Sequence, residues 1–310
     1  SALVFNCHID TVKPINNEWK TKPYSLSIKG SKCFGLGSVN CKGSTAVHLY
    51  LAKHFKKLFP NYKKRVCFTF VTDEENLGPE GTKLLKENKI INPHTIILGS
   101  PTNNNFIVEE RGVFWVNVEV FGKTSHAGEP NKGINSIIKA TKIINHLENN
   151  YKKFIKKYNN GSSKSSINIG IIKGGENVNV VPHITSFQID RRITIKENIN
   201  NSFKEIKNFI KRIDKSAKIK FLTGTNAFKS NKSNLYLKNL IKSYCLVKNK
   251  QPKFLNSIGV SDGRYFSNEK INIINIGPGD GEQGHKSNET LKINDLTDYF
   301  MILKNFLNFI

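Results

Sequence analysis

Short apolar segments alternate with segments of helical periodicity over the first third of the chain. Residues 2–6, 66–71 and 95–98 are β-rich apolar runs, whereas 47–59 and 81–89 repeat apolar residues at helical spacing. Strands that alternate with helices predict βαβ units, and therefore an α/β fold with a mainly parallel sheet and helices on both faces. Polar side chains follow these strands at their carboxyl ends, where open α/β sheets place their functional sites.

The pattern changes between residues 108 and 226. The predicted order there is strand, helix, strand, strand, helix and strand, at 114–121, 133–149, 166–172, 185–189, 199–213 and 217–222. This is the order of a ferredoxin-like α+β unit. The first pattern then resumes with a helix at 235–247, a strand at 271–276 and a helix at 296–310. We therefore predict one domain formed by 1–107 and 227–310, and an inserted domain at 108–226 in which the Asn- and Lys-rich segment 151–166 is a solvated loop.

The composition limits the class of protein and its partners. The chain has 310 residues, of which 38% are hydrophobic, so it is long enough to bury a core. Its net charge of +24 comes mostly from Lys, which like Asn is spread along the chain, so we attribute the charge to compositional bias and expect no nucleic-acid partner. No apolar run is long enough for a membrane span, and the N-terminus lacks the features of a signal peptide. Five cysteines without Cys-x-x-Cys spacing argue against a disulfide scaffold and for a reducing cytoplasm.

Four polar clusters follow the predicted strands. They are His8 with Asp10, the glycine-rich segment 37–43, the adjacent Glu74 and Glu75, and the segment 277–289 around His285. A histidine with a carboxylate two residues later is typical of a metal ligand held by its neighbour. Two consecutive glutamates at a strand end point in different directions, so one can bind a metal while the other faces a water. Each cluster alone has an ordinary structural explanation, but together they favour a hydrolytic metal site.

The order and wording of these motifs resemble the M20 metallopeptidases, specifically the branch of the acetylornithine deacetylases and succinyl-diaminopimelate desuccinylases. The resemblance runs through nearly the whole chain. It rests on His8-Ile9-Asp10-Thr11-Val12, Gly37-Ser38-Val39-Asn40-Cys41-Lys42-Gly43, Asp73-Glu74-Glu75, Thr124-Ser125-His126-Ala127, Asn179-Val180-Val181-Pro182, Asp190-Arg191-Arg192, Ser261-Asp262-Gly263-Arg264 and His285. It implies a zinc-peptidase-like catalytic domain at 1–107 and 227–310, with 108–226 as an inserted lid and dimerisation domain.

The resemblance also implies a role for each matching residue. His8 would bind one metal ion and Asp10 would orient it, while Glu75 and His285 would bind a second ion. Glu74 would be the general base, and His126, from the lid or from a partner subunit, would stabilise the oxyanion. The side chains expected to read substrate carboxylates are Arg191, Arg264 and Asn179. For the two arginines, a buried salt bridge with Asp190 or Asp262 is the alternative.

The sequence departs from the family pattern at two ligand positions. The bridging aspartate is replaced by Asn40, whose amide is uncharged and has a single carbonyl oxygen to offer. The carboxylate that completes the first metal site is replaced by Ser100, which leaves His8 as the protein ligand there. Cys7 or Cys41 would be alternative soft ligands. The family's segment before the first motif is also missing, so the chain is either a fragment or a reduced protein.

These observations predict a metal-dependent amide hydrolase that removes an acyl group from an N-acyl amino acid, of the N-succinyl-diaminopimelate or N-acetylornithine type, in lysine or arginine biosynthesis. We expect one or two zinc ions, or cobalt in their place, and a single-ion site would rest on Glu75, His285 and Asn40. The family also implies a cis peptide bond after Asn40, a homodimer formed through the lid, and no membrane partner. Two alternatives remain: a metal-poor homologue that binds ligands without catalysis, and a nucleic-acid binder.

Overall fold

The chain separates into two compact units. The computed structural model describes residues 2–15, 18–257, 259–267 and 269–310. The first unit comprises Ser1–Glu109 and Lys229–Ile310, and the second comprises Glu110–Phe228. The boundaries predicted from the sequence are 107/108 and 226/227. The short strands β6 (Glu109–Glu110) and β11 (Phe228–Lys229) pair with each other where the chain passes between the units.

The first unit is built on a parallel sheet. Its strand order is β12 (Asn272–Ile276), β5 (Pro93–Gly99), β1 (Ala2–His8) and β4 (Val66–Val71), and every neighbouring pair is parallel. All residues of β1 are buried, as expected for a strand covered on both faces of a parallel sheet. The predicted α/β fold class is confirmed.

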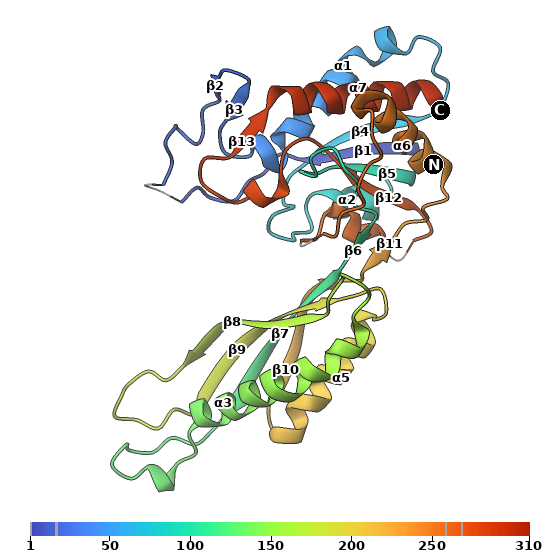
Figure 1. Cartoon of the computed structure of the whole chain (residues 1–310). Helices are drawn as coiled ribbons and strands as arrows, with labels where there is room; N and C mark the ends of the chain where they lie inside the picture. Colours follow the sequence, from blue (N-terminus) through green and yellow to red (C-terminus); the bar gives the residue numbers. More distant parts are fainter. Residues whose placement is uncertain (1, 16–17, 258, 268) are drawn as a thin grey trace. The chain divides into compact units, whose positions relative to one another are not determined.

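Helices cover both faces of this sheet (Figure 1). On one face lie α1 (Gly43–Leu58), α6 (Leu235–Lys248) and α7 (Ile293–Phe309), and on the other lie α2 (Thr82–Glu87) and the 3-10 helix η5 (Asp262–Phe266). The core between the sheet and the first three helices contains fully buried Phe5, Leu51, Leu303 and Phe306. Burial of each such side chain stabilises the fold by roughly 1.5–3 kcal/mol, which fixes the sheet whose carboxyl edge carries the polar clusters.

A small antiparallel sheet, which the sequence analysis did not predict, lies beside the parallel one. It joins β2 (Ser27–Lys29), β3 (Lys32–Phe34) and β13 (Thr290–Lys292) in the order β13-β3-β2. Each strand has three residues, too few to show a period of two in the sequence. The sheet ties the chain before segment 37–43 to the chain directly after segment 277–289.

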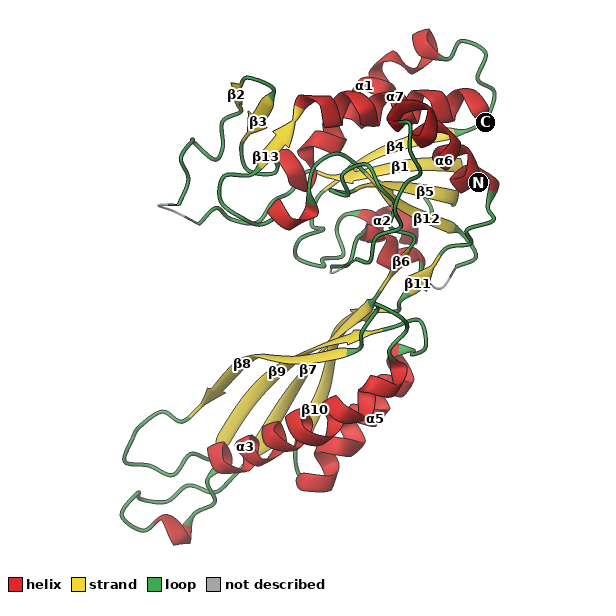
Figure 2. Cartoon of the chain, viewed as in Figure 1, coloured by secondary structure: helices red, strands yellow, loops and turns green. Residues whose placement is uncertain are grey.

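The second unit is an antiparallel sheet with helices on one face (Figure 2). The strand order is β10 (Lys218–Thr225), β7 (Gly112–Phe121), β9 (Ile184–Ile193) and β8 (Ser166–Gly174), and the covering helices are α3 (Ser136–His146) and α5 (Ile199–Ile213). Burial alternates along β9, which is typical of a sheet with one face on a core. The order of elements is β-α-β-β-α-β.

The prediction of a solvated loop at 151–166 is wrong for its first half. Helical turns continue from α3 through η3 (Leu147–Tyr151), α4 (Lys152–Phe154) and η4 (Ile155–Tyr158). Leu147, Tyr151 and Ile155 are fully buried against Phe209 and its neighbours. These three residues recur every four positions, but the Lys and Asn residues between them hid the apolar stripe in the sequence.

In the part of the chain that the structure describes, the helices lack the length and apolar character needed to cross a bilayer.

Candidate metal centre and active site

His8 is the last residue of β1 and is held by Asp10. Its Nδ1 lies 3.1 Å from the Asp10 carbonyl oxygen and 3.3 Å from Asp10 Oδ1. The other carboxylate oxygen of Asp10 accepts the main-chain N–H of Glu75 at 3.1 Å. Burial would raise the pKa of Asp10, but these contacts with His8 and Glu75 lower it to about 2. Asp10 is therefore charged at neutral pH and connects the His8 and Glu75 segments.

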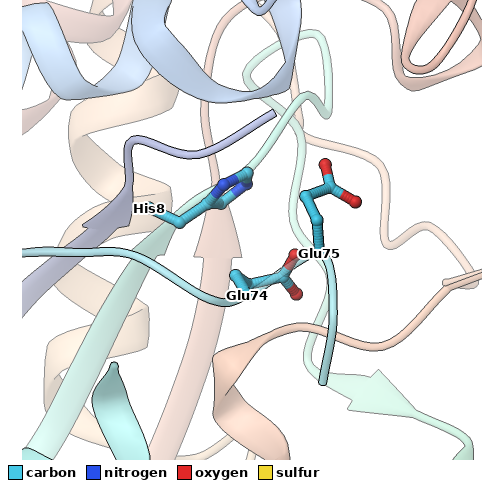
Figure 3. Close-up of side chains that lie close together, drawn as sticks. All are labelled: His8, Glu74 and Glu75. Carbon is cyan, nitrogen blue, oxygen red and sulfur yellow. The ribbon is translucent and has the colours of Figure 1, made fainter. Parts of the chain in front are cut away.

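Glu74 and Glu75 follow β4 and face His8 (Figure 3). One ligand atom from each of the three residues lies within 4.8 Å of the others. Both glutamate side chains are mostly buried, with 11% and 9% of their surface exposed. Burial raises the pKa of Glu74 to about 7, although the positive charges of His8 and Arg264 act in the opposite direction. A carboxylate in such surroundings is better suited to accept a proton at neutral pH than a solvated one.

Glu75 meets Asn40 and His285 in a tight triangle of side-chain atoms. Asn40 Nδ2 donates to Glu75 Oε1 at 2.7 Å and lies 3.1 Å from His285 Nε2. The same Glu75 oxygen lies 2.8 Å from His285 Nε2. The contact with Glu75 raises the pKa of His285. The structure therefore brings together the three residues expected to form a single-ion site.

A buried carboxylate that the sequence analysis missed holds the segment carrying Asn40. That segment is η1 (Ser38–Lys42), and the Asn40–Cys41 peptide bond is cis, as predicted. Glu289, 2% exposed, accepts the main-chain N–H groups of Val39 (3.1 Å) and Asn40 (3.4 Å) through Oε2. The available signal was a glutamate four residues after His285, directly before the short strand β13.

Ser100 lies at the expected sheet edge but adds no carboxylate to it. It follows β5, and its hydroxyl donates to Asn275 Oδ1 on the neighbouring strand β12 at 2.9 Å. The two cysteines near His8 have partners within the protein core. Cys41 Sγ donates to the His8 carbonyl oxygen at 3.4 Å, and Cys7 Sγ lies 3.1 Å from His48 Nδ1.

The prediction that Arg264 reads a substrate carboxylate is wrong in this structure. Arg264 is 3% exposed, and its guanidinium contacts Glu74 (3.0 Å) and Asp262 (3.4 Å). The alternative considered for it, a buried salt bridge with Asp262, is present and includes the catalytic candidate Glu74 as well. Its sequence context, Ser261-Asp262-Gly263-Arg264, gave no sign of this second partner.

Arg191, in the second unit, is also unavailable to a substrate, so that prediction is wrong too. The side chain is fully buried, and its guanidinium forms an ion pair with Glu197. Its Nε donates to the Tyr151 hydroxyl at 3.2 Å. Asp190, the partner considered for it, instead pairs with Arg192, whose Nε donates to Asp190 Oδ1 at 2.7 Å. Alternation along β9 explains the difference, because Arg191 points to the buried face and Arg192 to the other.

His126 and Asn179 lie next to each other on exposed parts of the second unit. The Ala127 N–H donates to the Asn179 carbonyl oxygen at 3.0 Å, and His126 forms an isolated β-bridge with Val180. His126 Nδ1 accepts the N–H of Gly128 at 3.0 Å, which leaves Nε2 as the ring nitrogen able to reach a ligand. The two residues expected to contact substrate thus lie on neighbouring, exposed segments of this unit.

The sequence of this chain is similar to that of a known protein family along nearly its whole length. The sequence profile of peptidase family M20/M25/M40 matches residues 4–308. The chain belongs to this family. It is 29% identical to a succinyl-diaminopimelate desuccinylase of Buchnera aphidicola, over 99% of this chain and 84% of that protein. It is 30% identical to the corresponding protein of Wigglesworthia glossinidia brevipalpis, over 100% and 83% of the two chains. An acetylornithine deacetylase of Buchnera aphidicola is 26% identical, over 94% and 76%.

Solved structures show the same M20 fold. The metallo-carboxypeptidase Sso-CP2 from Sulfolobus solfataricus aligns with a TM-score of 0.80 and 18% identity, over 99% of this chain and 84% of that one. The Bacillus subtilis protein YXEP, a dinuclear metal-binding peptidase, aligns with a TM-score of 0.73 and 17% identity, over 99% and 80%. The M20 proteins are metal-dependent hydrolases, and this M20 chain is a hydrolase.

The side chains of this chain fit one metal ion better than two. Catalytic zinc needs three protein ligands, and Glu75, His285 and the carbonyl oxygen of Asn40 can supply them once the amide of Asn40 is rotated by half a turn. A second ion would need a bridging carboxylate, and an amide offers one oxygen without charge. His8 would also have to hold that ion without the carboxylate that Ser100 replaces, while two dications repel each other.

Proposed function

We propose that this M20 hydrolase removes an acyl group from an N-acyl amino acid, of the N-succinyl-diaminopimelate or N-acetylornithine type, in lysine or arginine biosynthesis. The observation that carries the proposal is the convergence of His8, Glu74 and Glu75 at one sheet edge, with His285 2.8 Å from Glu75. The substrate class rests on the names of the relatives, since both the desuccinylases and the deacetylase act on acylated amino acids.

We further propose that the enzyme works with a single zinc ion held by Glu75, His285 and Asn40. Such an ion supplies Lewis acidity, which activates a water and polarises the amide carbonyl. Glu75 contributes the one charge of this ligand set, and the Glu289 carboxylate keeps the Asn40 segment in place. His8, with its Asp10 partner, would then face the substrate side of the site or hold a weak second ion.

The remaining steps belong to side chains of the chain itself. Glu74 would take a proton from the attacking water and return it to the leaving amine, a role that its burial favours. His126 would donate a hydrogen bond to the developing oxyanion, and Asn179 would bind a substrate carboxylate. Both residues are exposed and adjacent on the second unit, which supports their assignment to substrate rather than to the protein core.

We propose a homodimer formed through the second unit, and work in the cytoplasm. Strand β8 is an edge strand of its sheet, and Ile171 and Ile172 on it are 46% and 52% exposed. An exposed apolar edge strand is a ready surface for pairing with a second chain. All five cysteines are free, which supports a reducing compartment. Sedimentation of the purified protein would test the dimer.

The function can be tested with purified protein loaded with zinc. Amine release from N-succinyl-L,L-diaminopimelate and from N-acetylornithine would be followed while bound zinc is counted by mass spectrometry. We expect turnover of one of the two with about one ion per chain. Glu74→Gln should abolish turnover and keep the zinc, whereas Glu75→Gln should lose both. Turnover that persists in Glu74→Gln, or an inactive wild-type protein with zinc bound, would contradict the proposal.

A further inference from the structure

The Arg264 guanidinium donates hydrogen bonds to both the side chain and the main chain of Glu74. Arg264 Nη1 donates to Glu74 Oε1 at 3.0 Å, and Nη2 donates to the Glu74 carbonyl oxygen at 3.2 Å. A planar guanidinium that contacts two acceptors of one residue fixes the direction of the carboxylate as well as its charge. The contact uses Oε1, so Oε2 is the oxygen left to receive a proton.

Arg264 is in turn anchored by a series of buried polar side chains. Asp262 Oδ1 lies 3.4 Å from Arg264 Nη2, and Asp262 Oδ2 accepts a hydrogen bond from Thr82 at 2.7 Å. The Thr82 hydroxyl accepts from the amide of Asn6 at 2.9 Å, and this amide also donates to Thr69 at 3.0 Å. Asn6 lies on β1, two residues before His8. The series therefore connects Glu74 to the strand that carries His8.

Tyr265 holds the other side of the guanidinium. Its hydroxyl accepts from Arg264 Nη2 at 3.1 Å and donates to the Gly78 carbonyl oxygen at 2.6 Å. Gly78 closes the turn that begins at Asp73, since its N–H donates to the Asp73 carbonyl oxygen at 3.0 Å. Arg264 and Tyr265 together thus fix both ends of the turn on which Glu74 lies.

We propose that Arg264 is a positioning residue for Glu74 and that it makes no contact with substrate. The inference deepens the proposed function and rests on it, because it takes Glu74 as the general base. Two carboxylates, Glu74 and Asp262, already face this one buried guanidinium. A substrate carboxylate would be a third anion around a single desolvated cation, which is unfavourable. The geometry instead suits a cation that keeps one carboxylate oxygen directed at the reacting water.

The test compares Arg264→Ala and Arg264→Lys with the wild-type protein, all loaded with zinc, in amine release from the two acylated amino acids. In Arg264→Ala we expect kcat to fall by about 100-fold with KM nearly unchanged, because the base is misplaced while the binding groups remain. Added guanidinium should restore kcat of Arg264→Ala by about tenfold, since it fits the space and the fork geometry of the lost group. Methylammonium has the same charge but cannot donate two parallel hydrogen bonds, so it should restore little of the kcat of Arg264→Ala.

Lys86→Met is a matched control. Lys86 lies at the same contact between α2 and η5, where it pairs with Glu269 (2.6 Å) and lies over the Phe266 ring. It carries a positive charge like Arg264 and also donates to the main-chain oxygen of Tyr265, but it contacts neither Glu74 nor the Tyr265 hydroxyl that holds the guanidinium. We expect this variant to be less stable and to keep its kcat. A fall in kcat as large as that of Arg264→Ala would mean that any loss at this contact disturbs the site, and would overturn the proposal.

The KM of the Arg264 variants and the position of the Glu74 carboxylate separate a positioning role from a substrate contact. A rise in KM with unchanged kcat in Arg264→Ala or Arg264→Lys would identify a substrate contact and overturn the proposal. If Arg264→Ala does not fold, Arg264→Lys is read in the same way. A crystal structure of Arg264→Lys gives an answer that needs no activity: a displaced Glu74 carboxylate supports the proposal, and an unmoved one overturns it. An inactive wild-type protein would refute the proposed function and leave this crystallographic result valid.

Discussion

The side-chain amide of Asn40, which stands where the family pattern has a carboxylate, donates a hydrogen bond to Glu75 Oε1 at 2.7 Å. An amide and a carboxylate have the same shape but opposite preferences, because the amide can donate a hydrogen bond to Glu75 and a carboxylate can only repel it. The Asn40–Glu75 pair is thus stable without a metal ion, whereas an aspartate would need a cation between the two side chains. This difference governs the metal content that we expect.

Restoring the family ligands should restore a second ion. We expect Asn40→Asp with Ser100→Glu to raise bound zinc from about one to about two ions per chain, because a bridging carboxylate and a carboxylate beside His8 become available. Each single substitution should do less, since both serve one coupled cluster. Calorimetric titration with zinc would measure stoichiometry and affinity. Tight binding of two ions by the wild-type protein would show that Asn40 and Ser100 are no obstacle.

Glu289 should affect metal binding without touching the metal. In Glu289→Ala the buried N–H groups of Val39 and Asn40 lose their acceptor, which should cost about 1–3 kcal/mol of stability and weaken zinc binding. Glu289→Gln keeps a carbonyl acceptor and should retain most of both. Denaturant unfolding and zinc titration would measure the two effects. Glu282→Ala, on an exposed side chain of the same segment, serves as the control.

His48 should make the fold sensitive to acid. Burial lowers the pKa of His48 to about 3, whereas a histidine of the unfolded chain has a pKa of about 6.5. Between these values the unfolded chain takes up a proton that the folded chain does not. The contribution of His48 is therefore complete above about pH 6.5 and is lost as the pH falls towards 3.

Denaturant unfolding of His48→Leu at neutral and acid pH would test this. The variant should be less stable at neutral pH, because Tyr299 and Cys7 lose the ring nitrogens that lie 2.7 Å and 3.1 Å from them. It should also lose less stability on acidification than the wild-type protein. His183→Leu, at an exposed histidine, is the control. Equal acid sensitivity in His48→Leu and wild type would contradict the assignment.

The buried pair of Arg191 and Glu197 should stabilise the second unit. Arg191→Met leaves the Glu197 carboxylate buried without its cation, and we expect a loss of about 3–5 kcal/mol. Adding Glu197→Gln should recover part of this loss. Hydrogen exchange of the amides in β9 would report on the unit by itself. Arg212→Met, at an exposed arginine in the same unit, should change the protection little.

The sequence predicts the bounds of a helix or strand well where a single hydrophobic pattern covers the whole segment. The bounds of β4 (Val66–Val71) and α5 (Ile199–Ile213) agree with the prediction residue for residue. The first is a β-rich run in which Thr69 is the one polar residue, and the second begins at an asparagine cap and has one clear apolar face. The helix through Tyr151 was missed because lysines and asparagines separate the apolar residues that face the core.

The site was predictable in its position and less so in its contacts. Placing polar residues at strand ends suffices to bring His8, Glu74 and Glu75 together, because parallel strands end at one edge. Nothing in a local motif shows that Arg264 reaches Glu74, 190 positions away along the chain, or that Arg191 and not Arg192 faces the core. These contacts depend on tertiary packing and on strand register, which the motif alone does not contain.

The small sheet of β2, β3 and β13 couples the segments that carry Asn40 and His285. Strand β3 leads into the segment that carries Asn40, and β13 follows directly after Glu289. Pairing of β3 with β13 therefore holds these two segments together. Asn40 and His285 are therefore expected to come loose in a single cooperative event and not one after the other. Amide hydrogens of the two segments should then exchange with solvent at one shared rate. Added zinc should slow the exchange by the same factor in both segments.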